Sequence, residues 1–278
     1  MMAQAPSLRG ASETVWESVA PFLPDFTVEV LAEIDSTNSE LMRRARASQV
    51  QPILLVAERQ IAGRGRLGRD WFSEVDGAGR IDSDSNADLD LPSLTCSLGL
   101  PVAPCDLSGL SLAVGLSVVE SLHPRLRLKW PNDVLLDGRK LAGILIETVQ
   151  VGSERFVVIG IGVNIRTRPD DGLRTPSAAL RELLPDCNAG WVLQQIIPPL
   201  VKTVQRLVDS GFGVFRTAYH ARDALYGCVV QTSAAQEGVA RGVDATGALL
   251  VHTASGVEKV SSAEVSVRAV PLTDSTKP

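Results

Sequence analysis

Short apolar runs alternate with amphipathic stretches through the first part of the chain. Apolar and polar residues alternate along Phe26–Ile34, which predicts a half-buried strand. Further β-rich runs predict strands at Ile53–Ala57 and Leu94–Leu100. Between the first two strands, Thr37 and Glu40 have the spacing of a capping box, which predicts the start of a helix.

The middle of the chain predicts one helix followed by β-hairpins. Asp106 or Ser108 is suited to cap a helix that has a regular apolar face. The dipeptide Asp137-Gly138 favours a tight turn between two strands. Lys140–Val149 and Arg155–Ile165 then form a further predicted pair of strands.

The pattern changes after a helical stretch over Trp191–Phe215. Beyond Arg222, short β-rich runs separated by glycine or polar turns are typical of a small β-barrel. These runs are Cys228–Thr232, Glu237–Val243, Ala248–Thr253, Val257–Ser261 and Val265–Val270. We therefore predict an α+β fold, with a mixed-sheet domain over residues 26–222 and a small barrel over residues 223–270. An N-terminal extension (1–25) with room for one short helix and a tail (271–278) complete the chain.

Composition narrows the functional classes. The chain has 278 residues, of which 45% are hydrophobic, enough for a sizeable core. No apolar run approaches the roughly 20 residues that a membrane span needs, and the N-terminus lacks a basic region followed by an apolar block. We expect a cytoplasmic protein with no membrane partner. The formal net charge of −5 argues against a nucleic-acid binder. Dispersed cysteines and isolated histidines argue against a zinc site or a Cys–His nucleophile pair.

Residues 74–91 differ from the rest of the chain. They contain five aspartates, a single arginine as counter-charge and few apolar side chains. Such a stretch cannot bury enough surface to offset its ordering entropy, which is about 1–2 kcal/mol per residue. We interpret it as a passive, solvated and disordered loop. The alternative is an acidic flap that pairs with the arginines preceding it.

Glycines and arginines alternate along residues 63–69 (GRGRLGR). The glycines let the backbone bend and approach an anion closely, and arginines supply forked donors suited to phosphate or carboxylate. The segment lacks the Gly-Lys-Ser/Thr of a P-loop and the βαβ context of a dinucleotide fingerprint. An anion-binding loop and a solvated connector both remain open on this segment alone.

A second candidate is the segment 129–133 (KWPND) with the strand that begins at Lys140. A partly desolvated Lys140 ammonium at the start of an apolar strand can neutralise a carboxylate and an attacked phosphate together. Asp133 is suited to hold Mg²⁺ or to orient an amine. The alternative is that Asn132 and Asp133 form a turn and Lys140 is a solvated charge, as charged residues mostly are.

Two further segments complete the candidates. Residues 35–38 (DSTN) join a strand to a helix N-terminus, whose N–H groups can bind an anion, although Ser36 and Thr37 also suit a purely capping role. Small residues at 160–164 (GIGVN) allow a flat ligand to lie against a strand, or mark a bulge.

Together these segments resemble the biotin protein ligase family from about residue 26 to residue 268. The resemblance rests on DSTN (35–38), AERQ–AGRGRLGRDW (57–71), KWPNDVLLDGRKLAGILIE (129–147), GIGVNI (160–165) and the terminal 241–268, in this order. It implies the mixed-sheet, class II synthetase-like catalytic domain of biotin and lipoate ligases, followed by an SH3-like barrel.

The resemblance implies an ATP-dependent, AMP-forming ligase. Biotin and ATP with Mg²⁺ would give biotinyl-5′-AMP, and a lysine of a biotin carboxyl carrier protein, as in acetyl-CoA carboxylase, would then accept the biotin. Some family members carry an N-terminal winged helix-turn-helix. Only about 25 residues precede the first predicted strand here, too few for that module. We therefore expect no nucleic-acid partner, and a monomer or weak homodimer.

The resemblance also assigns roles to individual residues. Arg66, Asp133 and Lys140 are the expected catalytic residues, with Asp133 the candidate ligand of Mg²⁺. The residues expected to bind biotin are Ser36, Thr37, Asn38, Gln60, Gly63, Arg64, Gly65, Arg66, Lys140, Gly143 and Gly160. Those expected to bind ATP are Arg66, Trp71, Lys129, Asn132, Asp133, Asn164 and Arg268.

Two other functions remain open. A lipoate protein ligase shares the fold and the adenylation chemistry, but KWPND together with RKLAG favours biotin. A non-catalytic protein that senses biotin could retain the same fold. The complete charged set of Arg64, Arg66, Asp133 and Lys140 favours catalysis.

Overall fold

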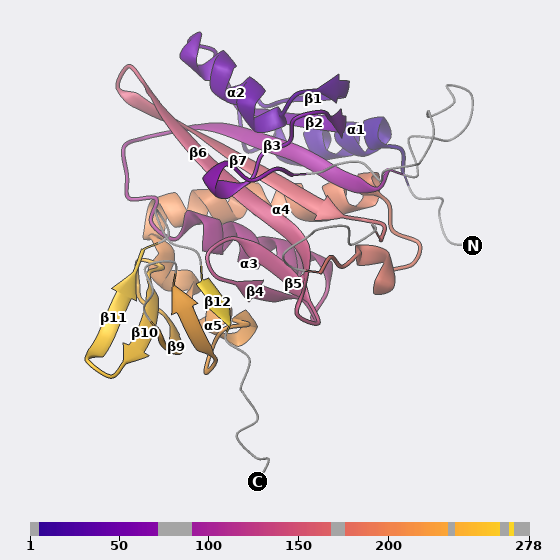
Figure 1. The fold of residues 1–278 in the computed structure, drawn as a ribbon. Helices are drawn as coiled ribbons and strands as arrows, with labels where there is room; N and C mark the ends of the chain where they lie inside the picture. The colour runs from indigo at the N-terminus through magenta and orange to yellow at the C-terminus, as the bar shows by residue number, and fades with distance from the viewer. Residues whose placement is uncertain (1–5, 72–90, 168–175, 233–236, 262–266, 270–278) are drawn as a thin grey trace.

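A computed structural model describes residues 6–71, 91–167, 176–232, 237–261 and 267–269. Its main feature is a seven-stranded mixed sheet in the order β1-β2-β3-β7-β6-β5-β4 (Figure 1). Only β1 and β2 pair in parallel among these ladders; the others are antiparallel. The strands are β1 (Thr27–Ile34), β2 (Ile53–Gln60), β3 (Ser93–Val102), β4 (Arg127–Lys129), β5 (Asp133–Leu136), β6 (Arg139–Val151) and β7 (Glu154–Asn164).

Helices cover both faces of the large sheet. Alternation along β7 divides its side chains, because Val157 and Ile159 join one apolar cluster while Phe156 and Val158 join the other. The larger cluster lies under α1 (Leu8–Val19), α3 (Leu110–Leu122) and α4 (Ala189–Ser210). The smaller one lies under α2 (Thr37–Arg46). The face under α2 also carries the glycines of β7, and this is where the functional cavity lies.

A second, antiparallel sheet follows the short helix α5 (Arg216–Arg222). Its strand order is β11-β10-β9-β8-β12. The strands are β8 (Val229–Thr232), β9 (Glu237–Val243), β10 (Leu249–Thr253), β11 (Gly256–Val260) and β12 (Val267–Ala269). A mixed sheet followed by a small C-terminal β-sheet confirms the predicted fold class. A ladder between β11 and β12, which would close the barrel, does not occur among the described residues.

The predicted capping box of α2 and the predicted caps of α3 were wrong, whereas Ser36, the other capping candidate of α2, is its N-cap. The N-cap of α2 is Ser36, whose hydroxyl accepts from the Ser39 N–H at 3.4 Å, so Thr37 is already inside the helix. Glu40 forms ion pairs with arginines one turn later instead of completing a capping box. Helix α3 starts after Gly109, which has a φ of +78° and no side-chain cap. The Asp106 carboxylate accepts a hydrogen bond from the Ser108 N–H, within the loop before α3.

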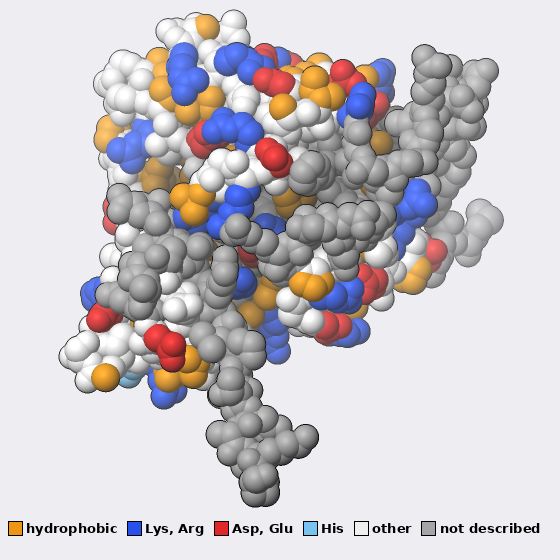
Figure 2. Space-filling view, in the orientation of Figure 1, with side chains coloured by type: hydrophobic (Ala, Val, Ile, Leu, Met, Phe, Trp, Pro, Cys, Tyr) orange, Lys and Arg blue, Asp and Glu red, His pale blue; other side chains and the backbone are white. Residues whose placement is uncertain are grey.

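The other predicted helices differ at their ends. Helix α1 begins at Leu8, five residues before the predicted position near Glu13, and its buried side chains pack against α4. Helix α4 is capped by Asn188 and ends at Ser210, where Gly211 adopts a φ of +67°. None of the helices in the described ranges is long and apolar enough to cross a membrane. Residues 72–90, most of the acidic stretch, lie outside the described residues. Over the described part of the face in Figure 2, basic and acidic side chains are interspersed.

Candidate active site

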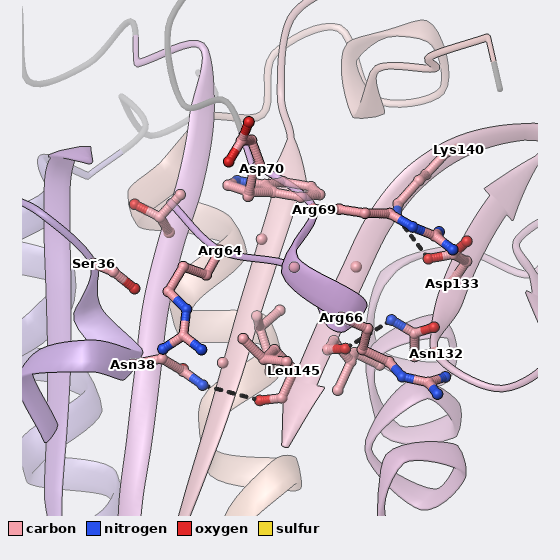
Figure 3. A pocket seen from close by; sticks show the side chains of 18 of the residues that line it. Ser36, Asn38, Arg64, Arg66, Arg69, Asp70, Asn132, Asp133, Lys140 and Leu145 are labelled. Carbon is pink, nitrogen blue, oxygen red and sulfur yellow. Dashed lines mark hydrogen bonds and ion pairs between the residues drawn. The ribbon is translucent and has the colours of Figure 1, made fainter. Parts of the chain in front are cut away.

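A cavity of about 140 Å³ opens on the α2 side of the large sheet. Strands β2, β3, β6 and β7 form its floor, the N-terminus of α2 closes one end, and the segment between β4 and β5 closes the other. The loop that follows β2 crosses between these ends (Figure 3). The lining residues are Ser36, Thr37, Asn38, Gln60, Arg64, Gly65, Arg66, Leu67, Arg69, Asp70, Trp71, Thr95, Cys96, Lys129, Trp130, Pro131, Asn132, Asp133, Lys140, Gly143, Ile144, Leu145, Gly160, Ile161 and Gly162.

Glycines on adjacent strands place no side chains on the floor of the cavity. Gly162 of β7 pairs with Gly143 of β6, and a Cβ on Gly162 would overlap the Trp71 indole. A Cβ on Gly143 would lie 3.2 Å from the same ring. Gly160 is crowded in the same way by the carboxamide of Asn38. These positions therefore favour glycine because side chains approach the backbone there, and the strand is regular, without a bulge at 160–164.

Buried hydrogen bonds fix the end of the cavity at α2. The carboxamide oxygen of Gln60 accepts from the Thr37 N–H at 2.8 Å and lies 3.0 Å from the Thr37 hydroxyl. The Ser97 hydroxyl lies 2.7 Å from the Thr37 hydroxyl and 2.6 Å from the Asn38 carboxamide oxygen. Asn38 and Gln60 are both less than a tenth exposed. This end is therefore a preorganised set of neutral donors and acceptors.

The carboxylate of Glu147 lies next to the neutral end of the cavity at α2. Glu147 accepts from the Asn38 amide at 3.0 Å and pairs with the Arg64 guanidinium at 3.3 Å. Arg64 also donates to the Ser39 hydroxyl at 3.3 Å. The charge of Arg64 is thereby balanced within the protein, so this arginine belongs to the hydrogen-bonding end of the cavity and not to the cationic end.

The opposite end of the cavity is cationic. The Lys140 ammonium lies 2.7 Å from Asp133 Oδ1 and 5.8 Å from the centre of the Trp71 ring. Both charged side chains are less than a third exposed. Asn132 exchanges hydrogen bonds with Ile144 of β6, donating from its amide at 2.9 Å and accepting at its backbone oxygen at 3.0 Å. The ends of β5 and β6 therefore hold these side chains in place.

The arginine loop carries a third cation into the cavity. Burial lowers the pKa of the Arg66 guanidinium, as does the neighbouring Arg69, whereas Asp133 raises it. Arg66 nevertheless stays charged at neutral pH. Leu67 adopts a φ of +58°, which is uncommon for a residue with a side chain. The loop is closed by the Gly65 N–H, which donates to the Arg69 carbonyl at 2.6 Å.

Cys96 also lines the cavity, as the one cysteine among the described lining residues. It is buried, and burial raises the pKa of its thiol to about 12. The thiol is therefore neutral at physiological pH, and no thiolate nucleophile is available there.

Most of the expected site residues line this single cavity, but three differ. Gly63 lies beside it, where a Cβ would collide with the Trp71 backbone. Asn164 donates from its amide to the carbonyls of Lys140 and Ala178, so it braces the strand that carries Lys140. The side chain of Arg268 lies outside the described part of the structure.

Sequence reasoning missed several polar residues at the site. Thr95 and Ser97 are small polar residues within the largely apolar strand β3, and Glu147 is the one acidic residue of β6. Each is a polar residue within an apolar run, and this pattern could have identified them as candidate site residues. The other missed lining residues lie within the quoted motifs, except Cys96, which lies between Thr95 and Ser97 on β3.

Comparison with known proteins agrees with this geometry. Residues 100–164 match the Biotin/lipoate A/B protein ligase family, and residues 231–268 match the Biotin protein ligase C terminal domain. The biotin–[acetyl-CoA-carboxylase] ligase of Paracoccus denitrificans is 33% identical over 85% of this chain and 98% of its own length. The chain belongs to the biotin protein ligase family. Another relative, the bifunctional ligase/repressor BirA of Escherichia coli, is 30% identical over 87% of this chain and 74% of its own length.

A solved biotin protein ligase shares the whole architecture. The enzyme from Aquifex aeolicus, in complex with biotin and ATP, superposes with a TM-score of 0.71 at 27% identity. The match covers 88% of this chain and 99% of the Aquifex chain.

Proposed function

We propose that this protein activates biotin with ATP and transfers it to a lysine of a biotin carboxyl carrier protein. The observation that carries the proposal is one cavity with two chemically different ends. Neutral donors and acceptors meet at α2, while Arg66, Lys129 and Lys140 gather at the other end. Biotin has the same two parts, a neutral ureido ring and a carboxylate.

The two ends determine how biotin would lie. The ureido group needs both donors and acceptors, which the carboxamides of Asn38 and Gln60 and the hydroxyl of Thr37 supply. The glycine floor leaves room for the flat ring system. The carboxylate would then point toward Lys140 and Arg66, where the cations are.

In the adenylation step, a biotin carboxylate oxygen forms a bond to the α-phosphorus of ATP, and the bond to the bridging oxygen breaks to release pyrophosphate. Two anions must approach each other, so fixed positive charge lowers the barrier. Lys140 is directed by Asp133, which holds its ammonium at 2.7 Å. No covalent enzyme intermediate is required.

Asp133 also fits the role of a Mg²⁺ ligand. No group of three or more acidic, histidine or cysteine residues that could hold a metal ion occurs in the described ranges. Mg²⁺ commonly uses one or two protein carboxylates together with substrate phosphates and water. Asp133 would thus hold an ion that arrives with ATP and offsets the charge of its phosphates.

In the transfer step, the carrier lysine forms a bond to the acyl carbon of biotinyl-5′-AMP, and AMP leaves. The amine must lose a proton, since its pKa is about 10.4 in model peptides. We assign Asp133 as the proton acceptor, because it is one of two carboxylates lining the described cavity and lies at the cationic end.

The test of this function is the exchange of radioactive pyrophosphate into ATP. Biotin should support the exchange and lipoate should not, since the cavity pairs a neutral hydrogen-bonding end with a cationic one. Exchange with lipoate alone would identify a lipoate-type ligase. Tight biotin binding without exchange would identify a non-catalytic biotin sensor.

Arg66→Gly should separate adenylate formation from adenylate retention. Arg66 lies on a glycine-rich loop that lines the cavity and is partly buried there, so its guanidinium can cover the phosphate of the bound adenylate. We expect the variant to form biotinyl-5′-AMP but to release it faster, labelling lysines of bystander proteins. Filter-binding of the adenylate measures the release rate. An unchanged rate would show that this loop does not retain the intermediate.

Other expectations stay predictions. They are the cytoplasmic location, the monomer or weak homodimer, and the lack of a nucleic-acid partner.

A further inference from the structure

A tight turn of the C-terminal sheet contacts the large domain. This turn, residues 244–247, joins β9 to β10. Asp244 builds it by accepting from the Thr246 and Ala248 N–H groups at 2.9 and 3.1 Å. Burial alone would raise the pKa of Asp244, but hydrogen bonds from Thr246 and Lys259 lower it to about 2, so the carboxylate is charged at neutral pH.

The tip of the turn is packed against the large domain without spare space. Gly247 has a φ of +83°, and a Cβ there would lie 2.8 Å from the Gly109 Cα and 3.1 Å from Leu112 Cδ1. Its carbonyl accepts a hydrogen bond from Trp130 Nε1 at 3.1 Å, across 117 residues of chain. The Trp130 side chain is 1% exposed, so this hydrogen bond is shielded from water.

Trp130 belongs to the cationic end of the cavity. It stands between Lys129 and Pro131, and all three line the site. Besides the strand pairings at its ends, side-chain hydrogen bonds hold this segment: Asn132 bonds to β6, the Pro131 carbonyl accepts from the Ser111 hydroxyl of α3 at 3.0 Å, and Trp130 bonds to Gly247. The first two belong to the large domain. The third is supplied by the C-terminal sheet.

We propose that the 244–247 turn positions the nucleotide end of the cavity through Trp130, so that the C-terminal sheet sets the affinity for ATP and not the affinity for biotin. The inference rests on the proposed function, which assigns ATP to this end. Trp130 is a positioning residue in this scheme. By bonding to Gly247, its indole fixes the segment that carries Lys129 and Asp133 into the cavity.

The test removes the contact from each side. Trp130→Phe deletes the indole donor, and Gly247→Ala pushes the turn away from Gly109. Gly227→Ala is the matched control: Gly227 lies in the same C-terminal part with a φ of +80°, but a Cβ there meets nothing within 4 Å. Both glycine variants suffer the same backbone strain, while only Gly247→Ala disturbs the contact.

The readouts are the KM values for ATP and biotin in pyrophosphate exchange by the full chain. Trp130→Phe and Gly247→Ala should each raise the KM for ATP about tenfold, the effect of losing a buried hydrogen bond. The KM for biotin should stay unchanged, and Gly227→Ala should change neither value. An effect on both KM values, an unchanged KM for ATP, or the same effect in Gly227→Ala would overturn the proposal.

Hydrogen–deuterium exchange tests the positioning role independently of the proposed function, because it does not require catalytic activity. If the wild-type chain lacks biotin-dependent exchange, the proposed function fails on its own. The amides of residues 129–133 should still exchange faster in Gly247→Ala than in Gly227→Ala. Equal protection of that segment in both variants would refute the positioning role.

Discussion

Replacing Lys140 with alanine is expected to lower the single-turnover rate of biotinyl-adenylate formation by about 100- to 1000-fold, the usual effect of removing one preorganised charge donor. The Lys140 side chain is less than a third exposed and lies at the cationic end. Removing it leaves Asp133 without its partner, so a negative charge replaces a neutral pair where two anions must meet. Rapid-quench measurement of labelled adenylate gives this rate directly.

Arg125→Ala is a suitable control for that experiment. Arg125 pairs with Asp137 at 2.7 Å, the same distance as in the Lys140–Asp133 pair, but both side chains of this pair are more than half exposed and neither lines the cavity. An exposed pair of this kind contributes little to stability, so the adenylation rate should match that of wild type. A wild-type rate in Lys140→Ala as well would remove Lys140 from the mechanism.

Replacing Gly160 with alanine is expected to weaken biotin binding about 10- to 100-fold, because buried polar groups would lose their partners. The new Cβ would collide with Asn38 Oδ1. Asn38 cannot easily move aside, since its carboxamide is held by Ser97, Leu145 and Glu147. Titration calorimetry with biotin measures the loss.

Gly213→Ala serves as the control for this second change. Gly213 has no positive φ, and a Cβ there would meet nothing within 4 Å. Its biotin affinity should equal that of wild type. If Gly160→Ala binds biotin normally, the ureido ring does not lie against Asn38, and the orientation proposed for biotin is reversed or displaced.

The local pattern of residue types was enough to predict the strands and the segments that form the site. Strand β1 and the Asp137-Gly138 turn appear where the sequence predicts them, because both depend on neighbouring residues. Helix ends were less predictable. Ser36 and Thr37 are adjacent and both suited to cap α2, and only packing decides between them.

The contacts that were not predicted join distant parts of the chain. Ser97 meets Thr37 across 60 residues, and Glu147 meets Asn38 across 109. The spacing of residues within either segment does not predict such a contact. A single sequence gives the residue types at the site, whereas their partners depend on the order of strands in the sheet, which brings β3, β6 and β7 together.

The charge of the cavity bears on how quickly it fills. Five cationic side chains and two carboxylates line it, in a chain whose formal net charge is −5. At distances beyond a Debye length of about 8 Å in physiological salt, an approaching nucleotide is screened from both charges. Closer in, the low-dielectric walls focus the local positive field on the polyphosphate. Capture of ATP is therefore governed by the mouth of the cavity, and the acidic character of the whole molecule imposes little penalty on the encounter.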